Sequence, residues 1–356
     1  MFRYCLSWFS ILLFIILFLS TNCAVKAPFY GAKEISISSD RIVLEKKDQI
    51  RKFEGRIREG LQKGFLPIID VEFHYWRKIE IEKLIKKMDE NGVALTWLMP
   101  YERLGSEESL KWNESYPDRF VPTTVGGDGP LWHKSDMGFL EKLGKDVLSG
   151  KYFAMGEFEA RHYRNPMVKV DRESPWDTHM PVDSATMEVV FELSSKTGIP
   201  FLLHHEMEDK LLPELERMLT RYPDAKVIWC HVGWNRNPKT WKTLTTADGV
   251  RQFLTRYPNL YFDFLALPVE PGPWAVMYDI HPGGVFSLNR KWKKVIEEFP
   301  ERFVLGSDIN HLVFDTYDGT IAKYRKVLLK QVNKEVAAKI AYKNAWKLMT
   351  GEEWGD

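Results

Sequence analysis

The chain has 356 residues, of which 44% are apolar and 28% are charged, and its formal net charge is +1. These proportions suit a well-cored globular protein of one large domain or two ordinary ones. Because the charges balance and no long basic run occurs, the sequence gives no sign of a nucleic-acid partner.

Residues 1–23, MFRYCLSWFSILLFIILFLSTNC, are predicted to be an export signal. Arg3 precedes an apolar stretch of about fifteen residues, which is shorter than the roughly 20 residues of a membrane-spanning helix. Cleavage or lipid attachment is therefore expected, with an uncleaved N-terminal membrane anchor as the alternative. The ending LSTNC resembles the lipidation site of bacterial lipoproteins, although Asn22 departs from the small residue preferred there. The sequence thus predicts an exported protein that is periplasmic, secreted or membrane-anchored.

Of the three cysteines, Cys5 and Cys23 lie in the signal region, which leaves Cys230 without an intramolecular partner in the mature chain. No disulfide framework is expected, although export would permit one. Cys230 is interpreted as a small buried apolar residue on a strand.

A lead segment over residues 24–63 carries helix-like charge from about Arg41 to Lys63 and precedes one predicted catalytic domain over residues 64–356. Apolar runs typical of strands recur through this domain. They are FLPIIDVEF (65–73), GVALTWLMP (92–100), RFVPTTV (119–125), YFAMGEFEA (152–160), IPFLLHHE (199–206), AKVIWCHV (225–232), NLYFDFL (259–265) and RFVLGSDI (302–309).

Amphipathic helices are predicted between these runs. The first has Ile81, Leu84, Ile85 and Met88 at helical spacing and ends at Asn91–Gly92. A second begins with Asp183 as its N-cap and turns Met187, Val190, Phe191 and Ser194 inward, and a third carries Leu212, Leu215 and Leu219. Strands that are apolar on both faces and alternate with helices indicate a parallel sheet covered by helices.

A junction of an aromatic residue and proline occurs four times, at Tyr116, Tyr222, Tyr257 and Phe299, each time just before a predicted strand. Proline ends the preceding helix, and the aromatic ring can pack under the turn. The repetition favours an α/β fold of the closed (β/α)8 TIM-barrel type, with an open doubly wound sheet as the alternative.

In such a barrel the functional site lies at the carboxyl ends of the strands. The first predicted strand ends in Glu72 and His74, which share one face because residues two apart in a strand point the same way. Later strands deliver Glu157, His204 and His205, His231, Asp263 and Asp308 in that order. Carboxylates and imidazoles gathered at one end predict a site for Zn²⁺, Mn²⁺ or Fe²⁺. Taken singly, each of these residues could equally be a hydrogen-bonded residue buried at a strand end.

The sequence resembles the amidohydrolase superfamily, specifically the amidohydrolase-related group that includes aminocarboxymuconate-semialdehyde decarboxylase-like enzymes. The resemblance runs from IIDVEFHYW (family form D-x-H-x-H) through GIPFLLH (P-x-x-x-H), KVIWCHVGW (H-x-G) and NLYFDF to ERFVLGSD and NAWKLM. It implies that Glu72, His74 and His204 are metal ligands and that Asp308 is a ligand that also handles the proton of the attacking water. His231 would bind a second metal ion or polarise the substrate.

Two positions qualify the resemblance. Glu72 stands where most of the family has histidine. Some decarboxylases of the family also carry glutamate at this position, and a carboxylate ligand favours Mn²⁺ over Zn²⁺. Glu157, in MGEFE, is similar to the bridging glutamate of TatD-like metal-dependent hydrolases, which would give two metal ions; the alternative is that Glu157 orients a ligand imidazole. His205 is expected to face away from the site, because neighbouring strand residues point to opposite faces.

The resulting hypothesis is a metal-dependent hydrolase that attacks an amide, ester or lactone bond of a small carboxylated compound, with one or two Zn²⁺ or Mn²⁺ ions. Non-oxidative decarboxylation is the alternative, and a non-catalytic binding protein on the same barrel is the third hypothesis. Arg161 and Arg164 would bind a substrate carboxylate unless they form loop salt bridges. Trp76, with Trp132, Trp176, Trp234 and Trp274, would line an aromatic mouth, while His281 is a weaker candidate. The expected partner is a small molecule, with N-terminal membrane attachment and a homo-oligomer left open.

Overall fold

The computed structural model describes residues 39–163, 178–234, 239–264, 276–282 and 285–355. The predicted export signal over residues 1–23 lies outside these ranges and stays a prediction. Within the described ranges, no helix combines the length and the apolar character that a membrane crossing requires.

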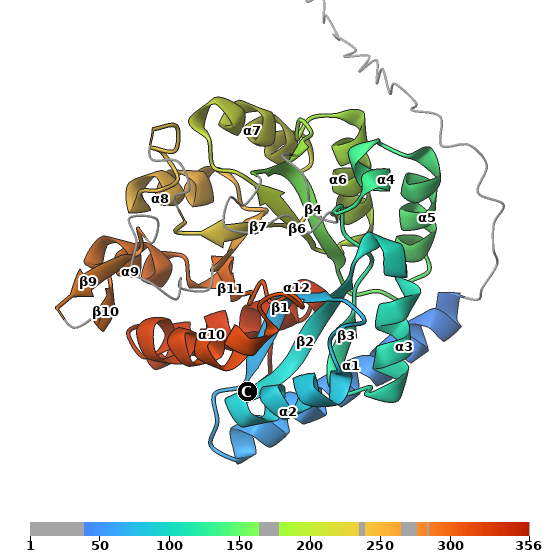
Figure 1. Ribbon diagram of the computed structural model, residues 1–356, viewed down its shortest axis with the longest axis horizontal. Coiled ribbons are helices and arrows are strands. Elements are labelled where there is room, and N and C mark those ends of the chain that lie inside the picture. The colour runs from blue at the N-terminus through green and yellow to red at the C-terminus, as the bar shows by residue number, and fades with distance from the viewer. Residues whose placement is uncertain (1–38, 164–177, 235–238, 265–275, 283–284, 356) are drawn as a thin grey trace, which may run out of the picture. The chain divides into compact units, whose positions relative to one another are not determined.

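All eight predicted strands are present, and seven of the eight contacts between neighbours in the ring are regular parallel pairings (Figure 1). The sheet order is β3-β2-β1-β11-β8-β7-β6-β4-β5. The eight strands are β1 (Ile68–Tyr75), β2 (Val93–Pro100), β3 (Phe120–Pro122), β4 (Met155–His162), β6 (Phe201–His205), β7 (Val227–Val232), β8 (Leu260–Phe264) and β11 (Phe303–Leu305).

The eighth contact, between β3 and β4, closes the ring through single hydrogen bonds and bridges. The Phe153 N–H donates to Pro122 O (2.9 Å), and the Thr124 N–H donates to Ala154 O (3.1 Å). Parallel bridges also join Thr123 to Ala154 and Gly127 to Phe158. A Cβ on Gly126 would lie 2.2 Å from the Glu157 carbonyl oxygen, so glycine is what permits this approach. The predicted α/β barrel is confirmed.

Helices cover the outside of the strands, as Figure 1 shows. They are α2 (Ile81–Asn91), α3 (Glu107–Ser115), α4 (Pro130–His133), α5 (Met137–Leu148), α6 (Ala185–Thr197), α7 (Leu212–Arg221), α8 (Ala247–Arg256), α9 (Arg290–Glu298), α10 (Tyr317–Lys323), α11 (Lys334–Ala338) and α12 (Asn344–Thr350). The predicted Asn91–Gly92 stop is confirmed by Gly92, which adopts a left-handed φ of 66°. Each of the four aromatic–proline junctions places its aromatic residue at a helix C-cap, of α3, α7, α8 and α9 in turn.

One predicted helix boundary is wrong by a residue. Ser184, not Asp183, is the N-cap of α6, and its side chain accepts a hydrogen bond from the Met187 N–H. The Asp183 carboxylate is instead paired with the Arg217 guanidinium at 2.5 Å. The Asp183 carboxylate, which the sequence predicted to cap α6, therefore forms an ion pair with a residue of α7 instead.

The lead segment contains α1 (Ser39–Gln62), which packs against the amino ends of the strands. Phe53 and Ile57 are fully buried in the core, and the Phe53 ring meets Phe153 edge-on at 5.5 Å. The Gln49 amide donates to Pro117 O, just before β3, and Lys46 Nζ lies 3.3 Å from Tyr152 O, just before β4. Helix α1 thus covers the end of the barrel opposite to the strand ends that carry the polar cluster.

Three short strands were not predicted. β5 (Thr178–His179) runs antiparallel to the end of β4, and β9 (Tyr278–His281) forms an antiparallel hairpin with β10 (Val285–Leu288). His281 is exposed on this hairpin and lies 2.6 Å from the Ser287 hydroxyl. β5 pairs with the carboxyl end of β4, and the Val276 N–H, two residues before β9, donates to Gly233 O just after β7.

Candidate metal centre

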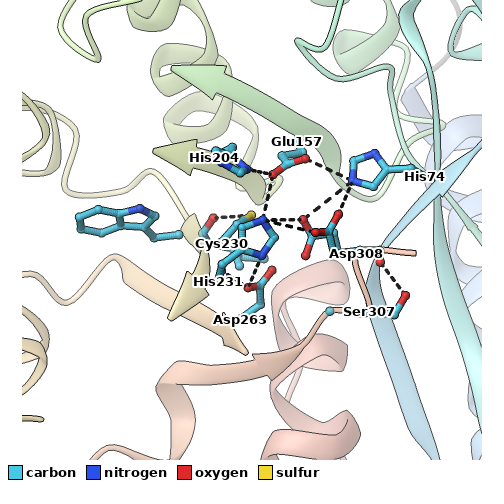
Figure 2. Close-up of polar contacts among 12 residues, drawn as sticks. His74, Glu157, His204, Cys230, His231, Asp263, Ser307 and Asp308 are labelled. Carbon is cyan, nitrogen blue, oxygen red and sulfur yellow. Dashed lines mark hydrogen bonds and ion pairs between the residues drawn. The ribbon is translucent and has the colours of Figure 1, made fainter. Parts of the chain in front are cut away.

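Acidic and imidazole side chains from six strands or strand ends meet at the carboxyl end of the barrel (Figure 2). Among the described residues, four groups of donors have ligand atoms within 4.8 Å of one another, and three of these groups consist of carboxylates and imidazoles alone. These three are Glu157–His204–His231, Glu72–His74–Glu157 and Glu72–His231–Asp308. The structure therefore brings together every residue that the sequence nominated as a metal ligand.

Glu157 is the centre of this cluster. Its carboxylate lies 2.7 Å from His204 Nδ1, 3.2 Å from His74 Nε2 and 3.6 Å from His231 Nε2. The carboxylate is buried and is shared among imidazoles from β1, β6 and β7, so it contacts both halves of the cluster (Figure 2). This position is more central than the sequence suggested, where Glu157 was an optional member.

His231 and Asp308 reach the cluster from backbone that L-residues rarely adopt. Their φ angles are 68° and 51°, in the left-handed region. The His231 N–H donates to Asp263 Oδ1 at 2.5 Å, and the Asp308 N–H donates to Glu72 O at 3.0 Å. These bonds hold the two turns in place, and strained backbone of this kind concentrates at functional sites.

Glu72 lies beneath the cluster and is fully buried. Neither of its carboxylate oxygens has a hydrogen-bond partner, although Oε1 lies 3.8 Å from His231 Nε2 and 3.9 Å from His74 Nε2. Next to it, Asp70 Oδ1 accepts from the Ser307 N–H at 2.8 Å and joins β1 to the end of β11. A buried carboxylate without donors is costly unless a cation or a proton balances it.

The charges in the cluster perturb one another strongly. Burial alone would lower the pKa of His204, but the Glu157 and Glu206 carboxylates outweigh it and raise that pKa to about 10. Burial opposes ionisation of Glu157, yet the surrounding imidazoles hold its pKa well below the usual value. Burial, with Asp263 and the other carboxylates adding to it, raises the pKa of Glu72.

The raised pKa values of the imidazoles mean that protons are bound at the position where a metal cation would fit. In the absence of an ion the imidazoles carry positive charge and balance the carboxylates. A divalent cation replaces such protons, because its ligands must be neutral imidazoles and ionised carboxylates. The donor set, two or three histidines with carboxylates, is one that Zn²⁺ and Mn²⁺ accept.

Asp308 differs from the other acids in its exposure. Its side chain is 36% exposed, whereas the side chains of Glu157 and Glu72 are 9% and 0% exposed. It lies 3.5 Å from His74 Nε2, and the two imidazoles His231 and His74 lower its pKa against the effect of burial. Asp308 is therefore an ionised carboxylate that a molecule in the mouth of the barrel can reach.

The predicted substrate-binding residues are placed differently. The Arg161 guanidinium donates to Thr178 O at 2.8 Å, lies 3.5 Å from the Glu208 carboxylate and stacks over Tyr163, which agrees with the salt-bridge alternative. Arg164 lies outside the described residues. Trp76 is half-buried and meets Tyr101 edge-on at 5.6 Å, and the Tyr101 ring lies 5.8 Å from His74.

The remaining tryptophans divide into two groups. Trp234 lies 5.9 Å from the His231 ring and is half-buried beside the cluster. Trp132 is fully buried and donates its indole N–H to Glu159 O, so its contribution is packing. Trp176 and Trp274 lie outside the described residues. An aromatic mouth is thus formed by Trp76, Tyr101 and Trp234 in the described part of the chain, and Tyr101 had not been identified from the sequence.

His205 faces away from the cluster, as strand alternation predicts. Its ring lies 5.8 Å from Trp229, and neither ring nitrogen has a hydrogen-bond partner. Burial lowers the pKa of this imidazole to about 4. His205 is therefore a neutral packing residue directly beside a ligand candidate.

Comparisons with known proteins agree with this geometry. A family model described as amidohydrolase matches residues 167–349, just over half of the chain, a range that includes His204, His231 and Asp308. No curated protein sequence matches the chain.

Two solved structures illustrate the similarity of fold. One is 2,6-dihydroxybenzoate decarboxylase in complex with 2,6-dihydroxybenzoate, at 12% identity and a TM-score of 0.51, covering 80% of this chain and 99% of that chain. The other is an amidohydrolase from Burkholderia multivorans with bound zinc, at 13% identity and a TM-score of 0.50, covering 79% of this chain and 98% of that chain. The resemblance read from the motifs is confirmed, and the chain belongs to the amidohydrolase family.

Proposed function

We propose that this protein is a metal-dependent hydrolase that cleaves an amide, ester or lactone bond of a small carboxylated compound. The observation that carries the proposal is the convergence of Glu72, His74, Glu157, His204, His231 and Asp308 at the carboxyl end of the barrel. This end of a TIM barrel is where active sites of the fold are built.

Two overlapping metal positions are proposed. His204 and His231 would hold one ion, and Glu72, His74 and Asp308 would hold another, with Glu157 between them. The zinc bound in the Burkholderia multivorans structure supports Zn²⁺ as one occupant, and the number of carboxylates supports Mn²⁺ as the other candidate. The proposal allows one or two ions.

A divalent cation in this site would lower the pKa of a coordinated water towards neutrality and polarise a substrate carbonyl. Asp308, ionised and exposed, accepts the proton of the attacking water and returns it to the leaving group. His231 positions the substrate carbonyl if it is not fully engaged as a ligand. Trp76 and Tyr101 exclude water from one side of the mouth and contact the apolar part of the substrate.

The predicted export fits hydrolysis, since an extracytoplasmic enzyme more often degrades nutrients or envelope material. Non-oxidative decarboxylation is the second candidate, and two observations favour it. Glu72 occupies the position that carries glutamate in some decarboxylases of the superfamily, and a decarboxylase with its aromatic acid bound has a similar fold. In that reaction the same ligands would be used, and the ionised Asp308 would take a proton from water and pass it to the carbon that loses CO₂, while the hydroxide left behind combines with CO₂ to give bicarbonate.

Metal content of the purified full chain is the first test, with His204→Ala and His205→Ala as a matched pair. The two residues are adjacent and both buried, but only the His204 ring faces the cluster. We expect one or two equivalents of Zn or Mn in the unchanged chain and in His205→Ala, and a loss of at least one equivalent in His204→Ala. Equal metal content in all three proteins would contradict the assignment of His204 as a ligand. No metal in any of them would contradict the metal-dependent enzyme and would favour the hypothesis of a non-catalytic binding protein.

A panel of amides, esters, lactones and aromatic acids then separates the two reactions. Hydrolysis of an amide, ester or lactone forms one new carboxyl group for each bond cleaved, whereas decarboxylation removes a carboxyl group as CO₂. Turnover by CO₂ release alone would contradict the hydrolase proposal. Asp308→Asn should abolish either activity while retaining at least one equivalent of metal, because Asn keeps an oxygen ligand but cannot accept a proton.

A further inference from the structure

Cys230 faces the interior of the barrel beside the acidic cluster. Its neighbour Trp229 points outward, where its ring lies 6.3 Å from Phe253 of α8 and its indole N–H donates to His205 O. Alternation along β7 therefore turns Cys230 inward. His231 would point outward in a regular strand, but its left-handed backbone brings it inward as well. Two consecutive residues of β7 thus lie beside the same cluster (Figure 2).

The atoms around the Cys230 thiol are buried and lack partners. Cys230 Sγ, a Glu72 oxygen and an Asp263 oxygen lie within 4.8 Å of one another. Both oxygens of Glu72 and Oδ2 of Asp263 have no hydrogen-bond partner, and both residues have no exposed surface. The Sγ itself makes only a long contact of 3.9 Å to Ile228 O. Buried polar atoms are almost always satisfied, so these two carboxyl groups need either a proton shared between them or a bound cation.

Resting on the proposed function of a metal-dependent enzyme, we propose that Cys230 Sγ, Glu72 and Asp263 form an inner metal position that binds a divalent ion through a thiolate. The three donors come from β7, β1 and β8. The Glu72 carboxylate also belongs to the outer cluster, since its Oε1 lies 3.8 Å from His231 Nε2.

The composition of the site favours a cation as the occupant. Three acidic groups around one cavity repel one another when ionised, and a divalent ion offsets that repulsion. On binding, the ion displaces the thiol proton, which leaves to solvent, and a sulfur–metal bond forms. Thiolate ligation selects Zn²⁺ or Fe²⁺ over Mn²⁺, so the inner position would prefer a softer ion than the carboxylate-rich outer one.

Gly306 packs directly against the two carboxylates of the proposed inner position. A Cβ placed on Gly306 would lie 2.8 Å from Glu72 Oε2 and 2.9 Å from Asp263 Oδ2. Both carboxylates therefore press against a residue that has no side chain, and the substitution Gly306→Ala would push them apart without removing any donor atom. Gly319 of α10 offers the matched control, since nothing lies within 4 Å of its added Cβ.

The test uses the full chain with Cys5→Ser and Cys23→Ser, which leaves Cys230 as its only thiol. Chelated, metal-free protein is titrated with Co²⁺, and the bound cobalt is counted by elemental analysis. Only a thiolate ligand gives the intense sulfur-to-cobalt charge-transfer absorption in the near ultraviolet. We expect this band to grow with bound cobalt, to be lost in Cys230→Ser, to weaken in Gly306→Ala and to persist in Gly319→Ala.

A second measurement needs no substitution at the site. X-ray absorption at the zinc edge of the zinc-loaded unchanged chain should show a sulfur neighbour at about 2.3 Å, which nitrogen and oxygen ligands at about 2.0–2.1 Å cannot imitate. Bound metal without a charge-transfer band and without a sulfur neighbour would overturn the inner position and leave the proposed enzyme standing. Failure to bind cobalt or zinc at all would overturn both.

Discussion

Two residues of the candidate centre are held in left-handed backbone, and this is the clearest sign of function at the scale of single residues. For a residue with a Cβ, that conformation costs roughly 1–2 kcal/mol relative to ordinary backbone. His231 and Asp308 both adopt it, and both turn their side chains into the cluster. Folding stability is thus lower than it could be at the positions where the chemistry is proposed.

Asp128, which is not one of the proposed metal ligands, provides a pH-dependent prediction. Burial raises the pKa of this carboxyl group to about 7, and Glu159 adds to the effect. In the unfolded chain an aspartate has a pKa of about 3.9, so between about pH 4 and pH 7 the folded state binds more protons. The free energy of unfolding therefore falls as the pH rises through this range.

Asp128→Asn should remove that dependence while keeping an oxygen that accepts the Glu102 N–H. We expect the metal-free variant to exceed the unchanged chain in stability at pH 8, by at most about 4 kcal/mol, and to match it more closely at pH 4. Urea unfolding at both pH values measures the difference. The exposed Asp224→Asn substitution is the control, and a gap for Asp128→Asn that does not depend on pH would contradict the assignment.

Sequence reasoning at the residue scale succeeded where strand alternation holds. The spacing of Glu72 and His74 placed both on one face, and their side chains lie 3.9 Å apart. The same rule separated His204 from His205. It could not find the inward orientation of both Cys230 and His231, because the left-handed turn at His231 depends on a hydrogen bond to Asp263, 32 residues away. Long-range contacts of this kind leave no local signal.

At the scale of elements, α1 is an addition to the barrel that contributes buried apolar surface. It covers the amino ends of the strands, and Phe53 contributes a fully buried ring to that contact. Phe53→Ala should lower the free energy of unfolding by about 3–5 kcal/mol, because the cavity adds to the lost apolar burial. Metal content should stay unchanged, since the cluster lies at the opposite end of the barrel.

Denaturant unfolding with elemental analysis of the folded protein tests this prediction. Lys52→Ala is the control on the same helix, since its exposed side chain should change stability by less than about 0.5 kcal/mol. A loss of metal in folded Phe53→Ala protein would show that the two ends of the barrel are coupled, contrary to the expectation.

Strands and helices were predictable where an apolar run or helical spacing was bounded by a residue that ends the element, such as proline or glycine. All eight strands occur where the apolar runs predicted them, and the aromatic–proline junctions end four helices. The β9–β10 hairpin was missed because each of its strands has only four residues and half of the eight residues are exposed, so no long apolar run marks it. The helix start at Asp183 was wrong because Arg217, from another helix, competes for its carboxylate.

At the scale of the whole molecule, ligand binding should raise global stability. Any ion that binds only the folded chain stabilises it by mass action, by about 2.7 kcal/mol at a free concentration 100 times the Kd. Adding Zn²⁺ or Mn²⁺ to chelated protein should therefore raise Tm by several degrees, roughly 2–4 °C for each kcal/mol. Differential scanning fluorimetry measures the shift. His204→Ala should show a smaller shift than His205→Ala, and equal shifts would place the ion elsewhere.

The seam between β1 and β11 has a consequence for the order of folding. Asp70 and the Glu72 carbonyl accept hydrogen bonds from the Ser307 N–H, so the first and last strands of the barrel meet beneath the cluster. Contacts this far apart in sequence form late, because closing a long loop is entropically costly. A nascent chain that has not yet emerged beyond β8 presents Glu72, His74 and His204 without Asp308. The proposed ion would therefore meet its full set of ligands only after synthesis has reached the last barrel strand.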